Sequence, residues 1–465
     1  MSDAWPLLHG GRCWAEWARF WPWLAVWGSV CWAGRLPAAE RPNIVLIMAD
    51  DLGYGELGCY GSSRMRTPRL DQLAATGLRM TDFHSNGAVC SPTRAALMTG
   101  RYQQRCGIDG VVTAKRHRHT GMPLAEQTLA EVLAGAGYAT GIFGKWHLGY
   151  SSDLNPTRQG FEDYTGFVSG NIDLFSHIDQ EGWYDWWHQE SLAVESGYAP
   201  HLLTDRGVKF IRRYRNEPFF LYLPHPAPHY PYQGPGDGAN RHIRQGPRPD
   251  GLPAIRTMPA LSGPDAARGY REMVEDLDAQ VGRIIDALDS CGIRDRTLLV
   301  FCSDNGGVAR PGLGGDNGPL RGRKGQLYEG GHRVPAIFNW PGRIRPGVSD
   351  ELSLTFDLLP TFAELAEATP TNELDGTSLA TLLLGRQPLP PRPVAWLSGS
   401  RMAYREGPWK LLLHKSSVEL YNLADDLAES TDLTGREPAR VRRLQAAAEQ
   451  LRLDIRGTTP MRTGS

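Results

Sequence analysis

Four segments of the chain share one pattern, in which a short apolar run ends abruptly in polar residues. Apolar runs of this length are typical of strands that are buried on both faces, as in a sheet covered by helices on each side. The pattern therefore predicts strands at Asn43–Asp51, Ala139–His147, Pro218–His229 and Thr297–Asn305.

Helical patterns lie between these runs, and the last two of them have apolar residues at i, i+3/i+4 spacing. The predicted helices are Thr67–Gly77, Thr128–Gly137, Leu203–Tyr214 and Met273–Gly292. Because strands and helices alternate, we expect the main body, residues 40–386, to be a three-layer α/β sandwich.

The pattern changes near Gln387. A proline-rich link, Gln387–Trp396, leads into short alternating segments at Trp409–Leu423, and an amphipathic helix follows at Pro438–Leu453. This pattern predicts a small C-terminal domain, residues 387–456, with an antiparallel sheet and one helix. Residues 457–465 are expected to be a frayed tail.

The first 39 residues have a composition of their own. Arg12 and Arg19 precede an apolar run, Phe20–Gly34, and small residues follow as far as Ala39. This is the arrangement of a secretory signal peptide, and the run is too short for a comfortable membrane span. The prediction is a secreted or periplasmic protein, with an uncleaved anchor as the alternative. No later segment is long and apolar enough to span a bilayer.

Charge and cysteine content narrow the choice of function. The formal net charge is −1 and 22% of the residues are charged, so no global field favours nucleic acid or an anionic membrane. Of the seven cysteines, two precede residue 40, which leaves an odd number for an oxidising compartment. The cysteine that stands out is Cys90.

Polar residues follow the predicted strands, and ligands of open α/β sheets bind beyond the carboxyl ends of the strands. Carboxylate and amide oxygens without cysteine or histidine suit a hard cation, Ca²⁺ or Mg²⁺, better than zinc. The candidate metal ligands are Asp50, Asp51, Asp304 and Asn305. The alternative is that these residues only cap turns.

Three cationic or imidazole groups are candidates for the same site. Lys145 and His147 alternate with Trp146, so in extended backbone both would project to one side. His229 lies in a proline-stiffened loop, in which His225 is expected to be structural. Solvated or structural roles remain the alternatives for all of these residues.

Cys90 precedes Ser91, a possible N-cap, and Pro92, which suits a first helical turn. The thiol would then lie at a helix N-terminus, where partial positive charge and free N–H groups favour anions. A thiolate with a base would indicate a cysteine hydrolase. That scheme leaves the hard-cation site and the lysines, including Lys324 in a basic glycine-rich loop, without a role; a sulfate or phosphate ester substrate accounts for them.

The chain resembles the formylglycine-dependent (type I) sulfatases of the alkaline-phosphatase-like superfamily, from Arg41 to about Asn422. CSPTR, beginning at Cys90, matches the C-x-P-x-R signature of that family. The other matching motifs, in family order, are DDLGYGELGCYG, GKWHLG, APHYP, SDNGG, PLRGRKGQLYEGG and ELYNLADD. The resemblance implies a large mixed, mostly parallel sheet between helices, followed by a small four-stranded antiparallel sheet with a helix.

The resemblance also implies a chemistry for Cys90. A maturation enzyme would oxidise the cysteine to formylglycine, whose hydrate has two hydroxyl groups. One hydroxyl would attack sulfur and displace the alcohol, and the other would then lose its proton, so that the aldehyde re-forms and sulfate leaves. The expected substrate is an organic sulfate monoester, with a carbohydrate as the expected alcohol.

By the same resemblance, Asp50, Asp51, Asp304 and Asn305, with the oxygen at position 90, would bind Ca²⁺. Arg94 and Lys145 would hold the hydrated group, and His147 would act as its base. His229 and Lys324 would bind sulfate oxygens, with one of them protonating the leaving group, and Lys145 would share in substrate binding.

Two other functions remain open. The first is a phosphoesterase or phosphonate hydrolase built on the same site, and the second is a non-catalytic glycan-binding relative whose Cys90 is never converted. Substrate specificity is expected to lie in loops 151–199 and 233–264. Asp173, His177 and several tryptophans of the first loop could contact a sugar, although packing roles are favoured for the tryptophans.

Overall fold

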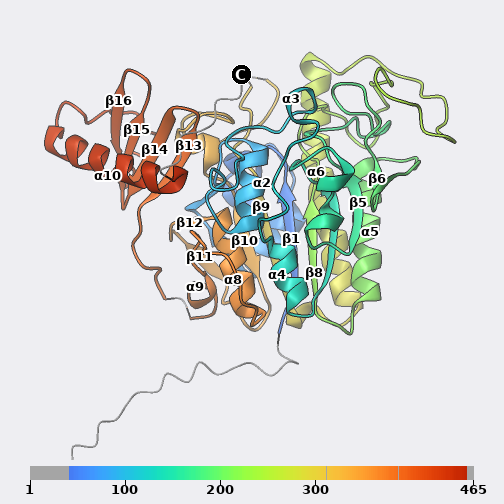
Figure 1. The fold of residues 1–465 in the computed structure, drawn as a ribbon, viewed down its shortest axis with the longest axis horizontal. Coiled ribbons are helices and arrows are strands. Elements are labelled where there is room, and N and C mark those ends of the chain that lie inside the picture. The colour runs from blue at the N-terminus through green and yellow to red at the C-terminus, as the bar shows by residue number, and fades with distance from the viewer. Residues whose placement is uncertain (1–40, 311, 386, 458–465) are drawn as a thin grey trace, which may run out of the picture. The chain divides into compact units, whose positions relative to one another are not determined.

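A mixed ten-stranded sheet forms the centre of the molecule (Figure 1). The computed structural model describes residues 41–310, 312–385 and 387–457, and all statements on the fold refer to these residues. The strand order is β11-β2-β10-β9-β1-β8-β4-β5-β6-β7. The strands are β1 (Asn43–Ala49), β2 (Leu78–Met80), β4 (Ala139–Lys145), β5 (Asp163–Phe167), β6 (Trp187–His188), β7 (Ser191–Leu192), β8 (Phe219–Pro224), β9 (Thr297–Ser303), β10 (Ala336–Asn339) and β11 (Gly347–Ser349).

The four predicted strands are neighbours in the middle of this sheet. Strands β9, β1, β8 and β4 all run parallel, with Val45 paired to Leu221 on one side and to Leu299 on the other. Every residue of the four strands is buried. Their carboxyl ends therefore meet at one edge of the sheet, as the sequence predicts.

Helices cover both faces of the sheet. Alternate residues of β1 belong to different hydrophobic clusters, with Leu46 on one face and Val45 on the other. The first face carries α2 (Cys90–Thr99), α4 (Leu129–Gly135), α8 (Leu358–Leu365) and α9 (Ala380–Gly385), and the second carries α1 (Pro68–Ala75), α5 (Ala199–Arg213) and α6 (Gly263–Ser290). Because helices pack on both sides of a buried sheet, the expected three-layer sandwich is confirmed.

Helix boundaries follow local capping as well as hydrophobic spacing. Thr128 and Glu131 form a reciprocal capping box at the start of α4, close to the predicted boundary. Helix α6 begins at Gly263, ten residues before the predicted Met273, and Pro264 lies in its first turn. The first turns of α6 expose many polar residues, so the apolar pattern used for the prediction did not reach them.

A second sheet follows the main body, as predicted. It is antiparallel and consists of β13 (Val394–Ser398), β14 (Arg401–Glu406), β15 (Trp409–Leu413) and β16 (Val418–Asn422), with α10 (Pro438–Arg456) beside it (Figure 1). Its hydrophobic cluster includes Ala96 of α2, and the Trp396 indole N–H donates to the Ser85 carbonyl at 2.8 Å. A domain boundary at residue 387 stays a prediction.

The remaining elements are short. Strands β3 (Phe83–His84) and β12 (Ser353–Leu354) form a parallel pair, and α3 (Ala114–His117) and α7 (Glu329–His332) are single turns. The proposed signal segment, residues 1–39, and residues 458–465 of the tail lie outside the described residues. None of the helices in the described ranges has the length and apolar character that crossing a membrane requires. The five described cysteines are all unpaired thiols.

Candidate active site

Two consecutive aspartates follow β1 at the carboxyl edge of the sheet. Asp51 has a left-handed backbone, with φ of 67°, which turns the chain sharply after the strand. The Asp51 N–H donates to Asp304 Oδ1 at 3.1 Å, so the turn after β1 is bonded to the turn after the neighbouring strand β9. The Asp50 N–H donates to the Ala227 carbonyl at 3.0 Å, which links the same turn to the loop after β8.

Two buried cations compensate two of the aspartates. Lys145, at the end of β4, donates to both oxygens of Asp50 at 2.9 and 2.8 Å. Arg94, from the middle of α2, donates to Asp304 Oδ2 at 2.8 and 3.2 Å and to the Lys145 carbonyl at 3.1 Å. Residues from four elements are therefore held in one charged network.

Asp51 is the centre of a second group of contacts. Asn305 Nδ2 donates to Asp51 Oδ1 at 2.8 Å, and Lys324 Nζ donates to the same oxygen at 2.5 Å. His229 Nε2 lies 3.5 Å from Asp51 Oδ2. The basic glycine-rich loop that carries Lys324 thus reaches the strand ends, as the sequence suggested.

Burial and the neighbouring cations shift the pKa values of these carboxyl groups in opposite directions. Burial raises the pKa of Asp50 to about 8, against the opposing effect of Lys145. Burial also acts to raise the pKa of Asp51, but Lys324 and His229 outweigh it and the net shift is downward. For Asp304 the same balance with Arg94 and Lys145 lowers the pKa. A further positive charge near Asp50 would favour its ionised form.

The same cluster has the donor set of a hard-cation site. Ligand atoms of Asp50, Asp51 and His229 lie within 4.8 Å of one another. Among the described residues, Asn305 Oδ1 is buried with no hydrogen-bond partner, although its amide nitrogen is bonded. An orphaned buried acceptor beside three carboxylates fits a cation bound by oxygen ligands.

Cys90 is the first residue of α2 and is 3% exposed. The N-cap is Val89, so the prediction that Ser91 caps the helix is wrong. The helix begins two residues earlier than a Ser91 cap would require, and the Ser91 hydroxyl accepts instead from the Val112 N–H at 3.0 Å. The thiol still lies at the helix N-terminus, where free N–H groups favour an anion.

A pocket of about 180 Å³ brings Cys90 together with three other predicted residues. These are His147, His229 and Lys324, and the remaining lining residues are Val111, Val112, Thr113, Tyr150, Ser169, Gly170, Asn171, Gln180 and Glu181. Arg94 and Lys145 lie behind this wall in the charged network. The structure therefore brings together every residue that the sequence placed in the site.

His147 reaches the pocket by a different route from the one expected. Its φ is 61°, so the extended backbone assumed for residues 145–147 is wrong at this position. Strand β4 ends at Lys145, and the left-handed turn directs the imidazole to the Val112 carbonyl, at 2.8 Å from Nε2. Burial, together with Lys145 and Arg94, lowers the pKa of His147 well below its usual value.

The other polar residues that the sequence singled out have packing roles. His225 is buried, and burial lowers its pKa to about 4. Asp173 accepts from the Phe175, Ser176, Asn240 and Arg241 backbone N–H groups. His177 is stacked on Trp186 with ring centroids 4.2 Å apart. Both Asp173 and His177 are fully buried, and neither lines the Cys90 pocket.

Several lining residues were not singled out from the sequence. Gln180 and Glu181 border the pocket from within loop 151–199, and Thr113 borders it from the segment after α2. The sequence predicts that loop 151–199 determines specificity, but no pattern in it distinguishes Gln180 and Glu181 from their neighbours. Loop side chains enter a site through tertiary contacts, which leave no periodic signal.

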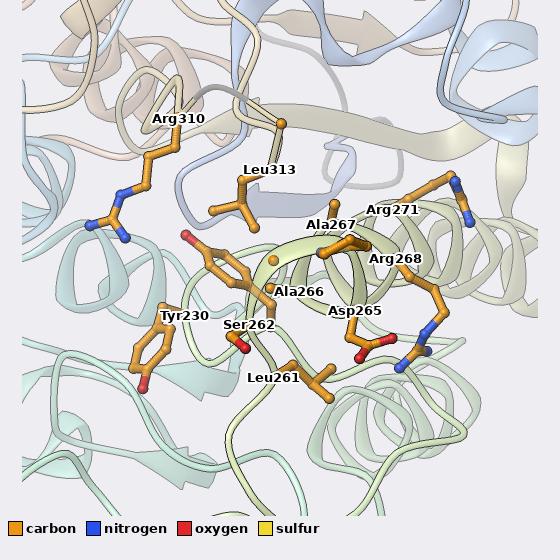
Figure 2. Close-up of a pocket in the computed structure, with 14 residues that line it drawn as sticks. Tyr230, Leu261, Ser262, Asp265, Ala266, Ala267, Arg268, Arg271, Arg310 and Leu313 are labelled. Atoms are coloured by element: carbon orange, nitrogen blue, oxygen red, sulfur yellow. The ribbon is translucent and has the colours of Figure 1, made fainter.

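A larger cavity of about 960 Å³ lies beside the loop that follows His229 (Figure 2). Figure 2 shows Tyr230 and Arg310 on one side of this cavity and Arg268 and Arg271 on the other. The cavity has no lining residue in common with the Cys90 pocket. Size alone therefore does not identify the reactive site of this chain.

The fold and the site agree with comparisons to known proteins. The family model described as Sulfatase matches residues 42–368. Arylsulfatase A from Bos taurus is 38% identical over 448 residues, which cover 89% of this chain and 83% of the relative. Human N-acetylgalactosamine-6-sulfatase is 33% identical, with coverage of 79% and 70%.

Solved structures give the same result. The crystal structure of Ps i-CgsB has a TM-score of 0.77 and 31% identity, with 89% of this chain and 93% of that chain covered. A phosphonate monoester hydrolase of Agrobacterium radiobacter, at 20% identity and a TM-score of 0.60, shares only the fold. An identity of 20% does not indicate that this chain hydrolyses phosphonates.

The fold and the charged pocket define a hydrolase of the alkaline-phosphatase-like superfamily. Within it, the chain belongs to the sulfatase family and is a sulfuric ester hydrolase.

Proposed function

We propose that this sulfatase hydrolyses a sulfate monoester of a carbohydrate, with a formylglycine made from Cys90 and with Ca²⁺ at the aspartate cluster. The observation that carries the proposal is the position of Cys90 at the start of α2, in a pocket shared with His147, His229 and Lys324. Formylglycine, when formed, supplies in its hydrated form a nucleophilic oxygen that an unmodified thiol does not have.

The proposed Ca²⁺ ligands are Asp50, Asp51, Asp304, Asn305 and the oxygen at position 90. Support comes from the unpartnered Asn305 Oδ1 and from the absence of thiolate ligands in this group of residues, since all of them offer oxygen. Mg²⁺ is the second choice, because it demands near-ideal octahedral geometry and keeps several waters. The ion would neutralise charge on the sulfate oxygens.

Arg94 and Lys145 are proposed to stabilise negative charge that develops at position 90. Both are buried, and each is held in place by an aspartate, Asp304 for the guanidinium and Asp50 for the ammonium. Cations that are oriented before the reaction need no reorganisation during it, which is the basis of electrostatic preorganisation.

His147 is proposed as the base, and the structure suggests which nitrogen accepts the proton. Nε2 lies 2.8 Å from the Val112 carbonyl, which can only accept, so Nε2 carries the hydrogen. Nδ1 therefore bears the lone pair, and it has no hydrogen-bond partner among the described residues. The lowered pKa of His147 keeps the imidazole neutral and able to accept a proton near neutral pH.

Lys324 is proposed as the proton donor to the leaving group, with His229 as a partner that binds substrate. Burial acts to lower the pKa of Lys324, but Asp51 outweighs it and the net shift is upward, so the ammonium is protonated. His229 Nδ1 donates to the Tyr230 carbonyl at 2.7 Å, and burial lowers its pKa to about 3. Its Nε2, which faces Asp51, would therefore have to gain a proton before it donates to a sulfate oxygen.

The carbohydrate substrate is inferred from relatives. One relative at 33% identity is a human N-acetylgalactosamine-6-sulfatase. A crystal structure of Ps i-CgsB with a neocarrahexaose is 30% identical to this chain, with a TM-score of 0.77. Ester sulfate on a sugar is therefore the substrate class that we propose. We also propose a secreted or periplasmic location, and a maturation enzyme that converts Cys90.

Mass spectrometry of the tryptic peptide 80–94 tests the central step. Protein made with a formylglycine-generating enzyme is expected to contain the aldehyde at position 90 in proportion to its activity on 4-nitrophenyl sulfate. Fully active protein with an unmodified cysteine would overturn the formylglycine proposal, and inactive protein whose Cys90 stays unconverted even with the maturation enzyme would favour the glycan-binding alternative.

Substrate comparison tests the phosphorus alternative. We expect 4-nitrophenyl sulfate to be hydrolysed with a higher kcat/KM than 4-nitrophenyl phosphate or a phenylphosphonate ester. Preference for either phosphorus substrate would show that the same site serves a phosphoesterase or phosphonate hydrolase.

A further inference from the structure

A second pocket adjoins the pocket that contains Cys90. Its volume is about 510 Å³, which is within the usual range for a small-molecule site. The lining residues are Ala114, Lys115, Arg118, Glu181, Trp183, Arg244 and Gln245, and we call this group the basic pocket. None of these residues belongs to the site described above except Glu181.

The basic pocket and the Cys90 pocket are neighbours. Glu181 lines both of them. Thr113 borders the Cys90 pocket and the next residue, Ala114, borders the basic pocket, so consecutive residues of one segment form a shared wall. A molecule that reaches from Cys90 past Glu181 would therefore meet the basic pocket next, whereas the larger cavity of Figure 2 shares no wall residue with either pocket.

The basic pocket carries an excess of positive charge. Lys115, Arg118 and Arg244 face one carboxylate, that of Glu181. Within the described ranges of the chain, none of these three cations forms a salt bridge. Arg118 also has a buried guanidinium nitrogen, Nη2, without a hydrogen-bond partner among the described residues. An unpaired buried donor is costly, so an anion that accepts its hydrogen bond would be stabilised.

Packing holds Arg118 in place. The Arg118 guanidinium lies 3.8 Å from the centroid of the Trp183 ring. Gly246 lies so close to this indole that a Cβ there would be 2.3 Å from ring atoms, and its φ is 72°. The indole is therefore confined and supports the guanidinium, and Arg118 is presented to the pocket in one orientation.

Hydrogen bonds hold the rest of the wall. Asp179 Oδ1 accepts from the Gly182 and Trp183 N–H groups at 2.8 and 2.7 Å. The Arg244 N–H donates to the Gly182 carbonyl at 2.9 Å, and its guanidinium donates to the Gln180 carbonyl at 2.8 Å. Two separate loops are thus joined beside the Cys90 pocket. Pre-positioned donors bind an anion with a smaller loss of conformational entropy.

We propose that the basic pocket is a second anion-binding subsite, which holds a sulfate or carboxylate group on the neighbouring sugar of a polyanionic glycan. The assignment rests on the proposed function, because the sulfate ester that reacts must lie at Cys90. Arg118 and Arg244 bind the second anion directly, and Lys115, one helical turn before Arg118, adds charge at the rim.

Inhibition of 4-nitrophenyl sulfate hydrolysis by a heparin tetrasaccharide tests this subsite. We expect competitive inhibition. The double variant Arg118→Gln/Arg244→Gln should raise the inhibition constant at least about tenfold. This is the change expected when one or more charge-assisted hydrogen bonds are lost. Competitive inhibition by inorganic sulfate should change little, because a sulfate ion competes with the aryl sulfate only when it occupies the Cys90 pocket. An unchanged inhibition constant for inorganic sulfate would also show that the double variant is folded.

Two further arms identify the anion and the location. A desulfated tetrasaccharide retains only carboxylates and a carboxyl-reduced one retains only sulfates; in calorimetric binding, the ligand whose affinity falls in the double variant carries the group that the basic pocket recognises. Arg271→Gln, which removes a cation from the cavity of Figure 2, is the matched control and should leave the inhibition constant unchanged. Equal inhibition of the double variant and the wild type, or an effect of Arg271→Gln alone, would overturn the proposal.

Calorimetric binding of the same tetrasaccharide distinguishes the two proposals. Loss of affinity in the double variant supports the subsite even if no aryl sulfate is hydrolysed, in which case it is the proposed function that fails. Unchanged affinity with normal hydrolysis overturns the subsite alone.

Discussion

Lys145 binds both carboxylate oxygens of Asp50, at 2.9 and 2.8 Å, and neither side chain is accessible to solvent beyond 1%. The lysine is the last residue of β4 and the aspartate follows β1, with β8 between the two strands. A buried ammonium that is fixed in this way is positioned before substrate arrives.

Replacing Lys145 by methionine should reduce catalysis, and it should also destabilise the fold because Asp50 loses its buried partner. We expect kcat on 4-nitrophenyl sulfate to fall by about 10²–10³-fold, as for the loss of one preorganised group at an oxyanion. Steady-state kinetics on protein of known formylglycine content gives the value. Lys209→Met, on the exposed side of α5, is the control. Equal activities of the two variants would contradict the role of Lys145.

Arg94 is expected to matter for stability as well as activity. Its guanidinium is 1% exposed and holds Asp304, so Arg94→Ala leaves a buried carboxylate without its partner. Losing one member of a buried ion pair costs ~3–5 kcal/mol, which urea unfolding measures. Arg158→Ala removes an exposed pair with Glu190 and should change stability little. A similar small effect of Arg94→Ala would show that Asp304 is compensated in another way.

Added Ca²⁺ should stabilise the protein through the aspartate cluster. At a concentration 100 times the dissociation constant, a ligand that binds only the folded state adds about 2.7 kcal/mol. We expect the Tm to rise with Ca²⁺ and less with Mg²⁺, and the rise to disappear in Asp304→Asn. Asp153→Asn, an exposed carboxylate elsewhere, should keep the wild-type response. A Ca²⁺ response that survives in Asp304→Asn would place the ion elsewhere.

Cys90→Ser tests the need for a second hydroxyl group. A serine can accept sulfate once, but it has no second hydroxyl with which to expel the product. We therefore expect no sustained turnover, with a sulfated protein detectable by intact-mass measurement after exposure to substrate. Multiple turnovers by this variant would refute the role given to formylglycine.

Asp82 should make stability depend on pH. Its carboxylate accepts from Arg405 at 2.6 and 2.9 Å, and it lies 3.1 Å from Arg333. Burial acts to raise the pKa of Asp82, but the two arginines outweigh it and the pKa is lowered. A lowered pKa in the folded state gives stability that is present above the unfolded pKa of about 3.9 and is lost as pH falls through the folded value.

The free energy of unfolding of Asp82→Asn should thus lie well below that of the wild type at pH 7, with the gap narrowing from about pH 5 downward. Urea unfolding from pH 7 to pH 3 measures the gap. A gap that does not change over this range would contradict the charge argument and leave only a packing effect. Because Arg405 belongs to β14, the variant should also loosen the small sheet from the main body.

Local pattern was sufficient for the four central strands and for the position of most site residues. Strand ends are visible because an apolar run stops at Asp50, Lys145, Pro224 or Ser303, and parallel neighbours must bring such ends together. The motif around Cys90, together with the other motifs in family order, indicated the family without tertiary information. A site residue can be recognised from the sequence when the residues that identify it lie within a few positions of it.

Only the tertiary structure decided which atoms meet. The contact of His147 with Val112 and the pairing of Lys324 with Asp51 both join segments that are distant in sequence. The basic pocket is a further example, since Arg118 and Arg244 are 126 positions apart, as their numbers show. Propensity and periodicity act locally, whereas the direction of a loop side chain is set by what packs against it.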